Sequence, residues 1–227
     1  MSKLVDLLGP SSKPIAISFV DAPPAGVSHV AAVEPAGCGY WRRAAEGETF
    51  FTESADHVRC PVGAHTHNVA LTPEQSKELE GLVGTMIGLE YLTMDDVAKI
   101  PRRSKPFKYA VYAPLDKAPV KPDVVLVRGN ARQLMLLAEA AQAAGVQGDG
   151  ATLGRPTCAV LPQAIESKKA ASSFGCIGNR VYTGAADDQA YFAIPGDKLA
   201  ALEARLAVIV HANRELEKFH RARAEVR

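Results

Sequence analysis

The sequence has few aromatic residues, no excess of either charge and no long apolar run. Its 227 residues include 26 basic and 25 acidic side chains, which gives a formal net charge of +1. A protein whose main task is to hold nucleic acid through its phosphates carries an excess of basic residues, so this balance argues against a nucleic-acid partner. Glycine and proline number 18 and 15, which is too few for a collagen-like or low-complexity chain.

The apolar runs are too short to cross a bilayer. No window approaches the roughly 18 consecutive apolar residues that a membrane-spanning helix needs. Residues 1–14, MSKLVDLLGPSSKP, lack the apolar stretch of a signal peptide. We therefore expect a cytoplasmic protein with no membrane partner. In a reducing compartment its four cysteines are core thiols, metal or cluster ligands, or redox groups rather than structural disulfides.

Apolar runs and amphipathic segments alternate along the chain. They predict strands at 15–20, 108–115, 122–129 and 189–195, and helices near 38–47, 72–88, 130–144 and from about 196 onward. The helix after Thr72 is expected to turn Leu79, Leu82, Val83 and Ile87 inward. This alternation predicts an α/β (or α+β) fold. We expect one domain, 1–227, in which 211–227 forms a charged helical tail.

The two halves of the chain, 13–100 and 108–210, resemble each other weakly. Residue pairs that match at an offset of 120 are Cys38 with Cys158, Ala44 with Ala164 and Glu46 with Glu166, while Cys60 and Cys176 match at an offset of 116. Two similar α/β halves around a shared core, arising from an internal duplication, could bring all four cysteines together. Chance similarity is the alternative, since repeats are recognised with certainty only when several units agree.

The cysteines form no zinc-finger or thioredoxin-like motif. Cys38 and Cys60 are 22 residues apart, and Cys158 and Cys176 are 18 apart, so no C-x-x-C is present. Four thiolates can hold a [4Fe–4S] cluster when the fold makes them converge. The alternatives are a haem or zinc ligand, a cysteine nucleophile, or unligated core thiols, because cysteine is among the residues most often buried.

Two further groups of residues are candidates for a cofactor site. His65 and His67, just after Cys60, would point to the same face of a strand and could share a metal, although two polar loop histidines are the commoner case. After Cys176 come Gly178, Asn179 and Arg180, where Arg180 could contact an anionic ligand or a cluster sulfur. No G-x-S-x-G elbow or Walker loop is present, so the sequence assigns no catalytic residue.

Several motifs together resemble one known family. The runs KPIAISF, RCPVGAH, APLDKAPVKPDVVLVRGNARQ and GCIGNRVYTGAADDQAYFAIPGDKL are similar to the domain of unknown function 169 family, over roughly 13–206. The resemblance implies that the cysteines and the GNR and DD segments belong to a shared pattern. Similar proteins tend to have small or apolar residues where this chain has His65 and His67, so the resemblance gives no support to a histidine metal site.

The sequence thus leads to one main hypothesis. We expect a cytoplasmic protein that binds a [4Fe–4S] cluster through Cys38, Cys60, Cys158 and Cys176 and acts in electron transfer or cofactor handling, with a redox or small-molecule partner. The competing hypotheses are a haem-binding protein, a cysteine-dependent enzyme, and a small-molecule binding protein whose cysteines belong to the core. A homo-oligomer is compatible with all of them.

Overall fold

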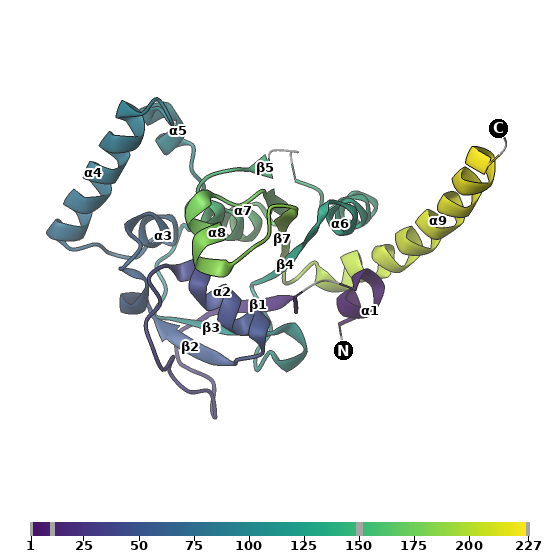
Figure 1. Ribbon diagram of the computed structural model, residues 1–227. Coiled ribbons are helices and arrows are strands. Elements are labelled where there is room, and N and C mark those ends of the chain that lie inside the picture. Colours follow the sequence, from purple (N-terminus) through teal and green to yellow (C-terminus); the bar gives the residue numbers. More distant parts are fainter. Residues whose placement is uncertain (1, 10–11, 149–151, 226–227) are drawn as a thin grey trace.

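The computed structural model describes residues 2–9, 12–148 and 152–225, which form a mixed α/β fold around a sheet (Figure 1). The strand order is β2-β3-β1-β4-β7-β6-β5, and neighbouring strands are antiparallel except for β5 and β6. The strands are β1 (Ile15–Val20), β2 (Phe50–Glu53), β3 (Tyr109–Pro114), β4 (Val124–Asn130), β5 (Thr152–Leu153), β6 (Ala171–Ser173) and β7 (Gln189–Pro195). The expected mixed class is confirmed.

Helices cover both faces of this sheet and make two cores. One face carries α2 (Gly37–Glu46), α3 (Pro61–Thr66), α7 (Val160–Ser167) and α8 (Ile177–Thr183), and the other carries α1 (Leu4–Leu8), α6 (Ala131–Ala143) and α9 (Leu199–Glu225). In the central strand β4, Val124 and Leu126 face the first core while Val125 and Val127 face the second. Burial on both faces explains why this strand is a continuous apolar run.

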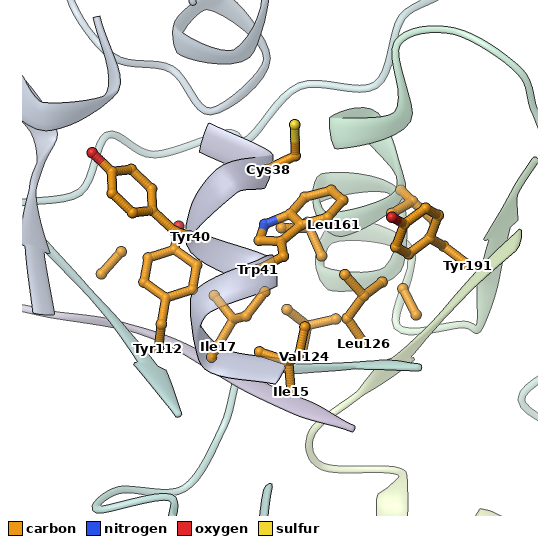
Figure 2. Packing of buried hydrophobic residues seen from close by; sticks show 14 of the residues in the cluster. Ile15, Ile17, Cys38, Tyr40, Trp41, Tyr112, Val124, Leu126, Leu161 and Tyr191 are labelled. Carbon is orange, nitrogen blue, oxygen red and sulfur yellow. The ribbon is translucent and has the colours of Figure 1, made fainter. Parts of the chain in front are cut away.

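The first core is centred on α2. Trp41 of α2 is 2% exposed and meets Tyr191 of β7 edge-on, with ring centroids 5.7 Å apart. Leu161 of α7 belongs to the same cluster of buried residues (Figure 2). Cys38 lies one turn before Trp41, and Figure 2 shows its sulfur directed away from the sheet. The packing of α2 therefore fixes where this thiol lies.

The two halves of the chain share an order of elements. The first half runs β1-α2-β2-α3-β3 and the second runs β4-α7-β6-α8-β7, with α4 and α5 inserted in the first and α6 and β5 in the second. In the sheet, β3 lies between β2 and β1 just as β7 lies between β6 and β4. The matched cysteines occupy matching places, since Cys60 and Cys176 are the N-cap residues of α3 and α8. An origin by internal duplication stays a prediction.

One helical segment stands away from the sheet. We call α4 (Pro73–Gly88) and α5 (Met94–Ala98) the arm, which is seen at the upper left of Figure 1. The expectation that α4 turns apolar residues into the core was wrong, because none of its residues is buried. The helix packs on α3 rather than on the sheet, so its apolar side is only partly covered.

The C-terminal helix continues past the body of the protein. Leu202, Leu206 and Val210 of α9 are buried against the second core. From 211 to 225 the helix carries no buried side chain, as expected for a charged tail, while 226–227 lie outside the described residues. None of the helices in the described ranges combines the length and the apolarity that crossing a bilayer requires.

Replacing Gly84 with alanine is expected to stabilise α4. A Cβ at this position would meet no atom within 4 Å, and alanine in a helix interior is favoured over glycine by about 0.5–1 kcal/mol. Hydrogen exchange of the α4 amides should slow by a corresponding factor, whereas the amides of β4 serve as an internal control and should not change. Unchanged or faster exchange in α4 would contradict this expectation.

Candidate functional site

All four cysteines line one cavity of about 450 Å³. They are free thiols and come from four different places in the chain. Cys38 lies in the first turn of α2, Cys60 and Cys176 are the N-cap residues of α3 and α8, and Cys158 lies in the 3₁₀ turn Thr157–Ala159 that leads into α7. The fold thus brings together two thiols from each half of the chain.

The two cysteines of the first half lie at the N-terminal ends of two helices, Cys38 in α2 and Cys60 before α3. The backbone N–H of Gly63 donates to the sulfur of Cys60 across 3.4 Å, which is the usual contact of an N-cap residue. Burial raises the pKa of Cys38 to about 12, and the nearby thiols Cys60 and Cys176 raise it further. Burial also raises the pKa of Cys60, again with a contribution from Cys176. These sulfurs are therefore close enough to repel one another when charged.

The two cysteines of the second half each contact a threonine hydroxyl group, and one of these contacts reaches the first half. The sulfur of Cys158 donates to Oγ1 of Thr66 in α3 across 3.7 Å, and the backbone N–H of Cys176 donates to Oγ1 of Thr157 across 2.5 Å. Burial raises the pKa of Cys158, and the charge of a Cys60 thiolate raises it further. The contact of Cys158 with Thr66 therefore links the thiols of the two halves.

A single metal ion needs at least three ligand side chains close together. Among the described residues, no three histidine, cysteine or acidic side chains are close enough to hold one metal ion. A tetrahedral zinc site with zinc–sulfur bonds of about 2.3 Å brings its sulfurs to about 3.8 Å from one another. In a [4Fe–4S] cube each thiolate binds its own iron atom, so its four sulfurs stand farther apart than around one zinc ion.

The histidines lie on this cavity but not as the sequence suggested. His65 belongs to the helix α3 and His67 follows it, so the expectation of a strand with both rings on one face was wrong. The ring Nδ1 of His67 donates to the carbonyl of Gly63 across 2.9 Å, and burial lowers the pKa of His67 to about 4. Burial likewise lowers the pKa of His65, whose side chain lines the same wall.

A third histidine on the cavity wall was missed by the sequence reasoning. His57 is 4% exposed, and its Nε2 lies 2.9 Å from Oγ1 of Thr52. Burial lowers its pKa to about 3. No local pattern marks His57, because its burial depends on Phe107 and Tyr112, which come from a distant part of the chain. His57 and His67 therefore line the cavity as neutral imidazoles near pH 7.

The segment after Cys176 divides into residues that reach the cavity and one that does not. Gly178 and Asn179 line it. Asn179 is 2% exposed and lowers the pKa of Cys38, yet neither its amide oxygen nor its amide nitrogen has a regular hydrogen-bond partner among the described residues. Arg180 instead donates to the backbone carbonyls of Ala186 and Phe174, 2.6 and 2.7 Å away. Its guanidinium thus connects the segments just before and just after α8, and Arg180 is not among the residues that line the cavity.

The arm forms the wall opposite the thiols. The side chains that it and the residues after it contribute are mainly apolar: Leu79, Leu82, Val83, Met86, Leu92, Val97 and Ile100. The sequence reasoning recognised the amphipathic pattern of α4 and assigned its apolar side to the core. The spacing of apolar residues shows that a helix has a side to cover, but it does not show whether protein or a cavity lies there.

Comparison with known proteins identifies the family. Searches among curated proteins and among solved structures find no match. The family model of DUF169, described as "Uncharacterised ArCR", matches residues 3–205. That range contains all four cysteines and the whole arm. The chain therefore belongs to the DUF169 family, as its motifs suggested.

Proposed function

We propose that Cys38, Cys60, Cys158 and Cys176 bind a [4Fe–4S] cluster and that the protein acts in electron transfer or cofactor handling. The observation that carries the proposal is the meeting of four free thiols, two from each half, on one cavity. A [4Fe–4S] cluster takes four cysteine thiolates as ligands. A cluster bound in this way supplies one-electron redox chemistry.

A [4Fe–4S] cluster and a zinc ion differ in how their thiolate ligands are arranged. In a cube each thiolate binds its own iron atom, so the four sulfurs stand farther apart than around one ion. His65 and His67 are not required as ligands in this arrangement.

Cluster binding would require the thiols on the cavity to lose their protons. Burial and mutual repulsion keep Cys38, Cys60 and Cys158 protonated in the free protein, because each pKa is raised. Bound iron cations would stabilise the thiolates and make deprotonation favourable. The N–H of Gly63 and the unpartnered amide of Asn179 are the groups that would then adjust the charge on the sulfurs.

The same thiols support a cytoplasmic location. Four free cysteines that share one cavity would be prone to pair in an oxidising compartment, whereas the cytoplasm keeps thiols reduced. The electron partner or the cofactor handled is not specified by the site residues. We therefore confine the proposal to the cluster, its ligands and its redox class.

Iron content after anaerobic reconstitution tests the proposal. The wild-type protein is expected to bind about four iron atoms per chain and to show the broad visible absorption of a cluster. Cys158→Ser is expected to lose most of this iron, because it removes one thiolate, while His65→Gln serves as a matched control at the cavity wall and should keep it. Colourless, iron-free protein would contradict the proposal, and a Soret band on haem addition in its place would favour a haem protein.

A further inference from the structure

Helix α4 presents an apolar stripe that none of the described segments covers completely. Leu79, Leu82, Val83 and Met86 recur at the spacing of one helix face and all line the cavity. None of them is buried, and Leu82 is 41% exposed. Helices of soluble proteins normally cover such a stripe, because exposing it to water costs free energy. The stripe of α4 faces the cavity instead.

A second apolar surface lies on the same cavity. Ile177 and Tyr182 of α8 line it, and they are 75% and 38% exposed. Cys38 and Trp41 lie deeper, at 9% and 2% exposed. The cavity thus has a buried end at the thiols and an apolar, partly open side between α4 and α8.

The polar groups on this cavity indicate what it would bind. Asn179 offers a buried amide whose only polar neighbour among the described residues is the Cys38 thiol, and such a group is costly unless a ligand or water also meets it. The charged lining residues are Asp96 and Arg155, which have opposite charges. The guanidinium of Arg155 lies 4.1 Å from the ring centroid of Tyr91. A neutral ligand with one hydrogen-bonding group fits this lining better than an ion.

We propose that the side of the cavity between α4 and α8 binds a neutral, mainly apolar organic molecule with one carbonyl or hydroxyl group that hydrogen-bonds to Asn179. The volume of about 450 Å³ lies in the range of small-molecule pockets. The inference rests on the proposed function, because it makes this molecule the small-molecule partner that lies beside the cluster. The arm contributes the stripe of α4 as one wall of the binding site.

Binding of 6-propionyl-2-(dimethylamino)naphthalene tests the inference. This probe is neutral and apolar and carries one carbonyl. Equilibrium dialysis against the anaerobically reconstituted full chain is expected to show saturable binding. Met86→Glu is expected to weaken binding at least about tenfold, since it places a carboxylate on the apolar wall. Leu89→Glu, which changes a 73% exposed leucine outside the lining, should leave the affinity unchanged.

A second probe tests the role of Asn179. The analogue with a propyl group in place of the propionyl group lacks the carbonyl, and it is expected to bind about fivefold more weakly to the wild type. The two probes should bind with equal affinity to Asn179→Leu. A carbonyl preference that survives this substitution would overturn the assignment to Asn179.

Iron analysis of the same samples separates the two proposals. Iron-loaded protein that binds neither probe would overturn the ligand site and leave the cluster intact. The same conclusion would follow if Met86→Glu and Leu89→Glu weakened probe binding to the same extent. Iron-free protein whose probe binding is lost only in Met86→Glu would overturn the cluster while supporting the ligand site. Because α4 has no buried residue and Leu89, just after it, is exposed, neither of these two substitutions disturbs a core.

Discussion

Replacing Trp41 with alanine is expected to lower the free energy of unfolding by about 3–5 kcal/mol. The indole is 2% exposed and packs edge-on against Tyr191. It belongs to α2 in the first half of the chain, whereas Tyr191 of β7 and Leu161 of α7 belong to the second (Figure 2). The substitution therefore leaves a void where the halves meet, and urea denaturation of the two proteins measures its cost.

Two substitutions control for this effect. Trp41→Phe keeps an aromatic ring in the same place and should recover a large part of the lost stability. Phe219→Ala removes an aromatic ring from the exposed part of α9, where the side chain is 58% exposed, and should change stability by less than about 0.5 kcal/mol. A Trp41→Ala cost as small as that of Phe219→Ala would show that Trp41 does not join the halves.

The central strands were predicted accurately because both of their faces are buried. The apolar run 15–20 is β1, with the same boundaries. Asn130 was predicted to begin the helix that the structure shows as α6. Its side chain accepts a hydrogen bond from the N–H of Gln133 across 3.0 Å, as an N-cap residue does. In these segments local patterns and tertiary packing agree, so the local signal was sufficient.

The parts that could not be predicted depend on neighbours distant in the sequence. The apolar stripe of α4 is the same pattern as a core-facing stripe, and only the position of the arm beside the cavity distinguishes them. His57 has no motif, because Tyr112 and Phe107 bury it from beyond the arm.

The cysteines fall between these cases. Their matched spacing in the two halves suggested that they could meet, and the structure places all four on one cavity. What they bind could not be derived from the spacing, because a shared cavity is compatible with more than one cofactor. The shared cavity is the additional information that the fold provides, and the cluster is proposed because four cysteine thiolates are its usual ligands.

Lowering the pH from 7 to 5 is expected to destabilise the protein by about 4 kcal/mol through two histidines. Burial lowers the pKa of His57 to about 3 and that of His67 to about 4, from 6.5 for an exposed histidine. Below pH 6.5 the unfolded chain binds protons that the folded rings do not accept, so stability falls as the pH falls. Each ring contributes up to about 1.4 kcal/mol per pH unit until its folded pKa is reached.

The groups around the two rings explain why they stay neutral. His57 lies against the rings of Tyr40, Tyr112 and Phe107, and His67 lowers its pKa further. The pKa of His67 is lowered by Arg103 in addition to burial. A second proton on either imidazole would thus be desolvated and would repel a neighbouring charge.

Urea denaturation at pH 7 and pH 5 measures the effect. His57→Gln removes one ring while keeping a hydrogen-bonding group for Thr52, and it should lose about half of the pH dependence that the two rings cause. His220→Gln, on the exposed end of α9, should keep all of it. Because carboxylates and any bound cofactor titrate alike in all three proteins, the difference between the variants isolates the histidines. Equal pH dependence in His57→Gln and the wild type would show that His57 accepts protons in the folded protein.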